Sequence, residues 1–371
     1  MKDGLLFLYR LRLMLKKELL ANLKDPKTRV ILFFPVIFQS LIFGYVATYD
    51  LDHAPYAVLD RSRSQESREL LAHIDGSSAL DRVLNLQNAE QIATAMDSGE
   101  VMLTVVIPQD FSRKLNRGEP VSLQVITDGR NTLTAGMSAG YIASIVGQFN
   151  AERNPKLNLV QTETISWYNP NLITRWTFLP ALVVMLGLVQ VLMLGGLSVA
   201  REREQGTFDQ LLVTPLSPAQ ILFGKAVAPI LIGLLQATAV IIICRYWFQI
   251  PLAGNLLDLY LAIFIFLLSC TGLGLSVSAI SQTMQQVMVY CFVLLMPMTL
   301  LSGLATPVSN MAEPLQIITY ANPMRFALEA VRRIYLEGAG TIDIAGNFIP
   351  MLAVAAVTLP LAGWLFRHNI E

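Results

Sequence analysis

The chain has 371 residues, of which 54% are hydrophobic and 15% are charged, and its formal net charge is zero. Soluble domains carry about 25% charged residues, so this composition, with a mean hydropathy of +0.52, favours an integral membrane protein. Lys and Arg are concentrated only near the N-terminus, which excludes a nucleic-acid-binding protein as the leading class.

The cysteines and histidines exclude further classes of protein. Cys244, Cys270 and Cys291 lie in apolar stretches and lack the spacing of metal ligands, and the histidines form no metalloprotease pair. We therefore expect no metal site. The N-terminal charges are interleaved with leucines and no small-residue cleavage site follows, so the first apolar stretch is expected to remain as a membrane anchor.

Residues 1–26 are expected to form a cytoplasmic amphipathic helix. Leucines recur at helical spacing on one face, while Arg10, Lys17 and Lys24 share the opposite face. Such a helix lies on the inner membrane surface; the alternative is a plain basic tail before the first span. Asp25 and Pro26 are residue types of a helix N-cap and first turn, so a new helix is expected to begin there.

Six later stretches have the roughly 20 apolar residues that a transmembrane helix needs. They cover residues 30–48, 177–199, 221–243, 256–280, 287–308 and 348–366. The basic residues before the first stretch place the N-terminus in the cytoplasm, and six spans return the C-terminus to the same side. Arg325, Arg332 and Arg333 run against this trend, because they lie in the connection 309–347, which the topology places outside.

Residues 50–175 separate the first two stretches and have the composition of a soluble domain. Strands are expected at 54–59, 83–86, 101–107, 121–127 and 159–166, and helices at 65–74, 89–98, 111–116 and 132–152. This alternation predicts a small α/β domain. The predicted fold class is therefore a polytopic α-helical membrane protein with six transmembrane helices and an extracytoplasmic α/β domain inserted between the first and second.

No Asp, Glu, Lys or Arg lies in the middle of the six stretches, so the sequence offers no carrier for a coupling ion. The polar residues there are neutral and include Gln39, Gln190, Gln236 and Thr299. They either hydrogen-bond between packed helices or line a translocation route. Gly224-Lys225 lacks the upstream glycine and following hydroxyl residue of a phosphate-binding loop, so ATP hydrolysis by that chemistry is not expected of this chain.

Residues 201–218 connect the second and third stretches. Phe208, Leu211 and Leu212 form a short apolar stripe at helical spacing, and Pro215 and Pro218 end the helix. The stripe either binds a partner protein or is buried against the ends of this chain's own spans.

The run Arg-Glu-Arg-Glu-Gln-Gly-Thr-Phe-Asp-Gln-Leu-Leu-Val-Thr-Pro-Leu at 201–216 resembles the signature of ABC-2 type permeases. Thr-Asp-Gly-Arg-Asn at 127–131, Trp-Tyr-Asn-Pro-Asn at 167–171 and Ala-Asn-Pro at 321–323 extend the resemblance over nearly the whole chain, in particular to the bacterial YbhR-like branch.

The resemblance implies an ABC-2 transmembrane domain at about residues 129–369, a connecting helix at 1–26 and a partly re-entrant outer segment at 309–347. It also implies a coupling helix at 201–218 that docks on a separate ATPase. The coupling residues would be Glu202, Glu204, Gly206, Thr207, Phe208, Gln210 and Leu211.

On this interpretation the chain is a non-catalytic permease subunit in the bacterial inner membrane, with both termini cytoplasmic. It would export drugs or other amphiphilic compounds, while its ATPase partners bind ATP and Mg. A second permease subunit, identical or different, and a periplasmic adaptor protein are further implied partners.

Two other classes remain open. In one, the α/β domain of a membrane-anchored binding or assembly protein does the work, although five clustered spans exceed what an anchor needs. In the other, the chain is a channel or an ion-coupled carrier, against which the neutral composition of the spans argues.

Overall fold

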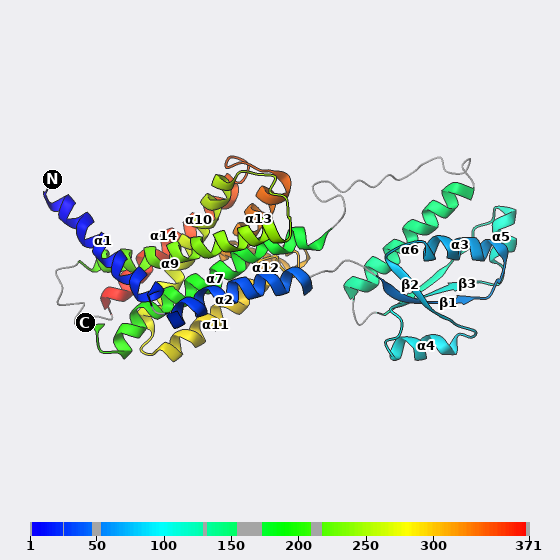
Figure 1. The fold of residues 1–371 in the computed structure, drawn as a ribbon, viewed down its shortest axis with the longest axis horizontal. Helices are drawn as coiled ribbons and strands as arrows, with labels where there is room; N and C mark the ends of the chain where they lie inside the picture. Colours follow the sequence, from blue (N-terminus) through cyan, green and yellow to red (C-terminus); the bar gives the residue numbers. More distant parts are fainter. Residues whose placement is uncertain are drawn as a thin grey trace. The chain divides into compact units, whose positions relative to one another are not determined.

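The computed structural model describes residues 2–24, 26–46, 53–128, 132–153, 173–208 and 217–368 (Figure 1). The chain divides into two compact units, one of residues 1–48 and 167–371 and the other of residues 49–166. The first unit is helical and the second contains a β-sheet.

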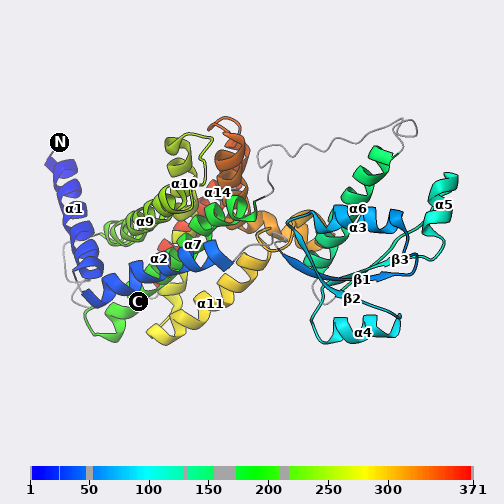
Figure 2. The same ribbon diagram turned by 45° about the vertical axis from the view of Figure 1, so that its right-hand side comes forward.

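The helical unit is built from long apolar helices that pack side by side. α10 lies against α7 and α14, and α7 also contacts α9 and α11 (Figures 1 and 2). Their bounds are α1 Lys2–Leu23, α2 Pro26–Val46, α7 Thr174–Glu204, α9 Pro218–Ile242, α10 Leu256–Ile280, α11 Met284–Leu300 and α14 Ala345–His368. The core between them is almost entirely apolar, with Leu182, Leu188 and Phe266 fully buried.

Four helical stretches of the described residues are long and apolar enough to cross a membrane: Thr174–Glu204, Gln220–Trp247, Leu256–Ile280 and Ala345–His368. Two shorter apolar helices, Leu32–Val46 and Met284–Leu300, lie where the sequence predicts the first and fifth spans. The chain is therefore a helical membrane protein.

The helix at the predicted fifth span, residues 287–308, ends before the predicted limit. α11 ends at Leu300, and the chain then turns through Gly303, whose φ is +83°. Apolar composition continues past Leu300, but a left-handed glycine followed by Pro307 cannot continue an α-helix.

Small residues bring α10 and α14 into close contact. A Cβ atom on Gly272 of α10 would lie 2.2 Å from Thr358 Oγ1 and 2.9 Å from the backbone nitrogen of Leu359 in α14. Close approach at small residues is how helices associate where lipid removes the hydrophobic driving force.

Short helices replace a simple loop between α11 and α14, and they provide partners for the arginines there. Arg325 lies over the Tyr320 ring at 4.6 Å, and Arg333 pairs with Glu337 at 3.1 Å. Arg332 donates from Nη1 to the Gly303 carbonyl at 3.4 Å. The segments are α12 Glu313–Ile318, α13 Pro323–Arg332, 3-10 turns at Val308–Asn310 and Thr319–Ala321, and a π-helical turn at Arg333–Glu337.

The second unit is an α/β domain with a four-stranded sheet in the order β2-β1-β3-β4. β1 pairs in parallel with β2 and β3, whereas β4 runs antiparallel to β3. The bounds are β1 Ala54–Asp60, α3 Gln65–Asp75, β2 Leu80–Asn85, α4 Glu90–Asp97, β3 Leu103–Ile107, α5 Phe111–Arg117, β4 Gln124–Thr127 and α6 Thr132–Arg153. The strand predicted at 159–166 lies outside the described residues.

The sheet is covered on both faces. Residues of α3, α5 and α6 pack with Tyr56, Val58 and Leu103 on one face, and α4 packs with Ala57 and Val106 on the other (Figure 1). Successive residues of β1 and of β3 face opposite cores, which gives the domain its own hydrophobic interior.

Candidate functional site

The candidate site is the end of α7 together with the helix ends that surround it. α7 ends in a Schellman motif: the Gly206 N–H donates to the Arg203 carbonyl at 3.1 Å and the Thr207 N–H donates to the Glu202 carbonyl at 2.9 Å. Gly206 adopts φ +67°, which a glycine reaches without steric cost. The chain can therefore leave α7 sharply at this position.

Phe208, directly after this turn, is buried within the same chain. It is 8% exposed and packs with Met14, Val199, Ile221 and Phe366, its ring centre lying 5.9 Å from that of Phe366. For Phe208, burial against the chain's own helix ends is thus confirmed. Leu211 and Leu212 of the same stripe lie outside the described residues.

The last turn of α7 also contacts α10 and α11. Arg203 Nη1 donates to the carbonyls of Ala279 and Ser281, at the end of α10, at 3.1 Å and 3.3 Å. A cation is favourable at a helix C-terminus because the carbonyl dipoles point toward it. Glu204 Oε2 accepts from the N–H of Met284, the first residue of α11, at 2.9 Å.

Glu202 turns inward and binds two lysines from other helices. Its Oε1 lies 2.7 Å from Lys17 Nζ of α1, and its Oε2 lies 2.8 Å from Lys225 Nζ of α9. The Lys225 side chain is fully buried. The segment before Phe208 is therefore joined to α1, α9, α10 and α11.

The seven coupling residues expected from the sequence divide into three groups. Glu204, Gly206 and Thr207 are exposed, whereas the side chains of Glu202 and Phe208 are directed into the chain. Gln210 and Leu211 lie outside the described residues. The sequence did not identify Lys17, Arg203 and Lys225 as members of the site. The available signal was Lys225, which lies one helical turn inside an apolar stretch, because a lysine in that position needs an acidic partner.

The four neutral polar residues suggested for a pathway lie on four helices. Gln236 is buried and its Nε2 donates to the Leu32 carbonyl of α2 at 2.7 Å, while Thr299 donates to the Leu295 carbonyl in its own helix at 2.8 Å. Gln39 is half-buried. Gln190 Nε2 is buried and has no hydrogen-bond partner within the described part of the chain.

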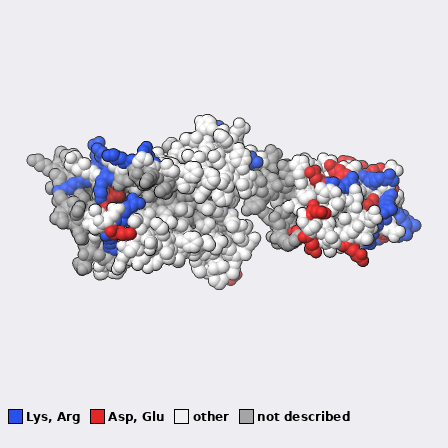
Figure 3. All heavy atoms as spheres, turned by 60° about the horizontal axis from the view of Figure 1, so that its bottom comes forward, with Lys and Arg blue, Asp and Glu red and all other residues white. Residues whose placement is uncertain are grey.

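Charged side chains are unevenly spread over the helical unit. On the face shown in Figure 3, blue and red atoms gather at the end that carries α1 and the end of α7, and the rest of this unit is nearly white. Within the α/β domain both signs are mixed over the surface shown. An uncharged band beside a charged end is what a bilayer core and its polar interface require.

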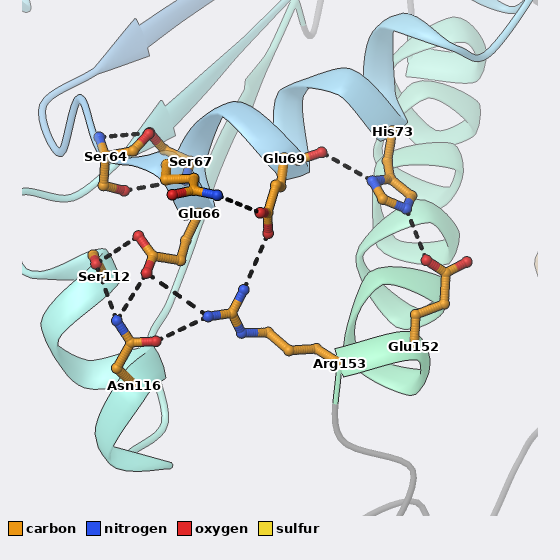
Figure 4. A network of polar contacts seen from close by, with 10 residues as sticks. Ser64, Glu66, Ser67, Glu69, His73, Ser112, Asn116, Glu152 and Arg153 are labelled. Atoms are coloured by element: carbon orange, nitrogen blue, oxygen red, sulfur yellow. Dashed lines mark hydrogen bonds and ion pairs between the residues drawn. The ribbon is translucent and has the colours of Figure 1, made fainter.

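The α/β domain has a polar network of its own (Figure 4). Arg153 of α6 binds Glu69 of α3 at 3.2 Å and Asn116 of α5 at 2.9 Å. Hydrogen bonds from Ser112 and Asn116 lower the pKa of Glu66 to about 2. The network connects three helices that cover one face of the sheet.

His73 extends this network to the end of α6. Its Nδ1 lies 2.9 Å from the Glu69 carbonyl and its Nε2 lies 3.0 Å from Glu152 Oε2 (Figure 4). The hydrogen bond to Glu69, followed by that to Glu152, raises the pKa of His73 above its usual value. Both ring nitrogens donate only in the imidazolium form.

An apolar cavity of about 250 Å³ lies beside this network, between α3, α5, β4 and α6. Its walls include Leu70, Phe111, Val125 and Phe149, and Asn150 adds a polar group.

Comparison with known proteins identifies the family. The model of the family described as "ABC-2 family transporter protein" matches residues 27–364. The chain is 39% identical over 366 residues to "Probable multidrug ABC transporter permease YbhR" of Escherichia coli (strain K12), covering 98% of this chain and 99% of that protein.

Other relatives are less similar and also match over most of the chain. "Probable multidrug ABC transporter permease YbhS" of the same organism is 27% identical over 98% of both chains. "Linearmycin resistance permease protein LnrN" of Bacillus subtilis (strain 168) is 23% identical over 92% of this chain and 95% of its own length. The chain belongs to the ABC-2 family of transporter proteins and is a membrane permease subunit of that family.

Proposed function

We propose that this chain forms the membrane-spanning half of an exporter whose work comes from ATP hydrolysed by separate subunits. The observation that carries the proposal is the junction at 201–208, which contacts the ends of α1, α9, α10, α11 and α14. A force applied there acts directly on five other helices of the unit. A channel or a simple anchor has no need of such a junction.

In the proposed topology six helices form the spans: α2, α7, α9 with its π-helical extension Ile243–Trp247, α10, α11 and α14. Both termini and the junction lie on the cytoplasmic side of the inner membrane, and the α/β domain lies outside. The gathering of charge at the α1 end supports this orientation (Figure 3). The segment 309–347 lies at the outer face and is partly re-entrant.

The ATPase is proposed to dock on the exposed part of the junction. Glu204, Gly206 and Thr207 are exposed there, and Gln210 and Leu211 remain proposed contacts. ATP and Mg would be bound by the ATPase, not by this chain. A second permease subunit, identical or different, completes the membrane part, and a periplasmic adaptor protein is the proposed partner of the α/β domain.

The proposed cargo is a drug or another amphiphilic compound, as the words "multidrug" and "linearmycin resistance" in the relatives' names suggest. Gln190 supports a route beside α7, because its buried amide nitrogen has no partner in the described residues and a cargo group can satisfy it. Gln39, Gln236 and Thr299 remain proposed lining residues.

Co-purification tests the proposal most directly. The chain is expected to purify with a nucleotide-hydrolysing subunit, and the reconstituted pair is expected to hydrolyse ATP faster when an amphiphilic drug is added. Failure to recover such a subunit from native membranes would overturn the proposal.

A cysteine-accessibility experiment tests the orientation. The natural cysteines Cys244, Cys270 and Cys291 are buried, so Thr207→Cys introduces the exposed thiol that matters. An impermeant maleimide is expected to label it in inside-out vesicles and not in intact cells. The reverse pattern would place the junction outside and contradict coupling to a cytoplasmic ATPase.

The alternative, a membrane-anchored binding protein, is favoured by one observation, the apolar cavity in the α/β domain. This alternative predicts that the α/β domain binds its ligand or partner equally well without any ATPase. It also predicts that removing the ATPase causes no loss of export. The same co-purified and ATPase-free preparations distinguish the two functions.

A further inference from the structure

Lys225 lies near the start of α9, and its ammonium group is shielded from solvent. Its side chain is 0% exposed, and its Nζ lies 2.8 Å from Glu202 Oε2, 2.9 Å from the Ser198 carbonyl and 3.3 Å from Glu18 Oε1. Lys225 Nζ donates hydrogen bonds to the Ser198 carbonyl and Glu18 Oε1, and Glu202 Oε2 adds a close ionic contact. The acceptors come from α7 and α1.

The surrounding charges close into a ring. Lys17 Nζ lies 2.7 Å from Glu202 Oε1 and 3.8 Å from Glu18 Oε1, so that Lys17, Glu202, Lys225 and Glu18 alternate in sign around a closed path. The ring has no net charge. Only Lys17 is substantially exposed, with half of its side chain accessible, and the two carboxylates are nearly covered.

Such a ring resists separation of the helices that carry it. Apolar side chains can slide past one another at little cost, whereas parting a buried ion pair leaves a charge without solvent or partner. Lys225 has no water to replace Glu202 or Glu18 if either helix moves away. The ring therefore favours joint motion of α1, the end of α7 and the start of α9.

Backbone packing beside the ring acts in the same direction. A Cβ atom on Gly224 would lie 3.2 Å from Met14 Cβ and 2.5 Å from Met14 Cγ, so α9 and α1 approach closely at this point. α1 in turn ends at Leu23 and α2 begins at Pro26, which leaves little chain between them. Movement of α1 is consequently passed to α2.

We infer that Lys17, Glu18, Glu202 and Lys225 form a rigid joint. This joint makes α1 and the start of α9 move as one body with the junction at 201–208. The inference rests on the proposed function. Glu202 then acts as a positioning residue inside the permease and is not itself a docking contact for the ATPase. The ATPase displaces the junction, and the joint carries that displacement to α1 and α2.

A reversible cross-link tests whether the joint stays closed. Met14→Cys with Gly224→Cys places two Cβ atoms at a separation slightly below the roughly 3.5–4.5 Å of a disulfide, and the three natural cysteines are buried. The variant would be studied as the full complex with its ATPase. Oxidation is expected to form the disulfide and to leave drug-stimulated ATP turnover within about twofold of the reduced form, a change equivalent to less than RT.

Two results would overturn the joint. One is a cross-linked complex that loses turnover about tenfold and regains it with reductant, because α1 and α9 would then have to separate during transport. The other is failure of the two cysteines to cross-link in the membrane. A wild-type complex without drug-stimulated turnover would instead refute the proposed function, so the two failures are distinguishable.

A charge series gives a second measurement, which also serves if the cysteine pair impairs folding. Lys225→Met leaves two carboxylates beside one lysine, and Glu202→Gln leaves two lysines beside one carboxylate. The double variant leaves only Lys17 beside Glu18, so the cluster again has no net charge. Each single variant is expected to export about tenfold less drug per ATP hydrolysed, and the double variant to recover to within about threefold of wild type.

Arg12→Gln is the matched control, because it removes a positive charge from an exposed position of α1. It is expected to leave the drug exported per ATP unchanged. If the four charged residues only stabilised the fold, the single variants would be obtained in lower yield. The drug exported per ATP would then be unchanged. A normal ratio in a Lys225→Met complex of normal yield would contradict the inference.

Discussion

The guanidinium of Arg203 lies 5.1 Å from the centre of the Phe208 ring, across the turn that ends α7. Its Nη1 is at the same time bound to carbonyls at the end of α10. One arginine thus holds the aromatic side chain of the junction in contact with a neighbouring helix, by a cation–π interaction and charge-assisted hydrogen bonds.

Phe208→Ala is expected to destabilise the helical unit by about 3 kcal/mol, since it empties a site lined by Met14, Ile221 and Phe366. Thermal unfolding of the purified chain in detergent measures the effect. Phe208→Leu, which retains most of the apolar volume, serves as the control and is expected to unfold close to wild type. An alanine variant as stable as wild type would show that Phe208 is not packed in this cluster.

Gly206→Ala is expected to weaken the turn by about 1–2 kcal/mol, because alanine pays a steric cost at φ +67°. A Cβ there would meet no atom within 4 Å, so crowding makes no contribution. Drug-stimulated ATPase activity of the complex should fall while the chain stays in the membrane. Gly206→Asn should retain more activity, since asparagine tolerates this conformation; equal activity of all three proteins would remove the turn from the mechanism.

A charge at Leu211 is expected to uncouple ATP hydrolysis from export, because an ionised side chain disfavours an apolar contact with the ATPase. Leu211→Asp in the co-purified complex, compared with Leu211→Met, tests this by transport per ATP hydrolysed. Normal drug-stimulated turnover in the aspartate variant would remove Leu211 from the proposed coupling contacts.

Gly272→Ala is expected to cost about 1–3 kcal/mol, since its Cβ would enter the space of Thr358 and force α10 and α14 apart. Gly346→Ala, in the neighbouring helix α14, is the control, because no atom lies within 4 Å of its Cβ position. The midpoint of thermal unfolding should fall for the first variant only. Equal midpoints would mean that the two helices are not in this close contact.

The stability of the α/β domain is expected to depend on the protonation of His73. Its pKa is raised in the folded state, so its contribution is fully present below the unfolded value of about 6.5 and is lost as pH rises through the folded pKa. Hydrogen exchange in α3 and α6 should therefore be slower at about pH 5.5 than at about pH 8.5, after correction for intrinsic rates.

Glu152→Gln provides the control for this prediction. It removes the charge that faces Nε2 while the Glu69 carbonyl remains, so the pH dependence should shrink without vanishing. A pH dependence of protection that is identical in wild type and Glu152→Gln would exclude the His73–Glu152 pair as its source.

Apolar length and helix-capping residues made parts of the fold predictable. The predicted stretch 256–280 coincides with the limits of α10, where Asn255 caps the first turn through its side chain. The end of α11 was missed because apolar residues continue beyond it, and only the conformation of Gly303 shows where the helix ends. Hydropathy measures composition, and it does not register a left-handed turn.

The candidate site was predictable as a segment but not as a set of contacts. The spacing of Phe208 indicated an apolar contact, while its partners Met14 and Phe366 come from the two ends of the chain. On α1 the sequence emphasises the leucine face, yet Met14, Glu18 and Asn22 are the most deeply buried described residues of that helix. A charged residue on a packing face is recognisable only when its partner, here Lys225, is placed beside it.

α11 has 17 residues and so rises only about 25 Å, while a hydrocarbon core is about 30 Å thick. If it spans as proposed, lipid chains beside it must compress to match, while those beside the much longer α7 need not. With these spans the protein would impose an uneven thickness on the bilayer around it. Its activity should depend on acyl-chain length, with shorter chains favouring the arrangement seen here.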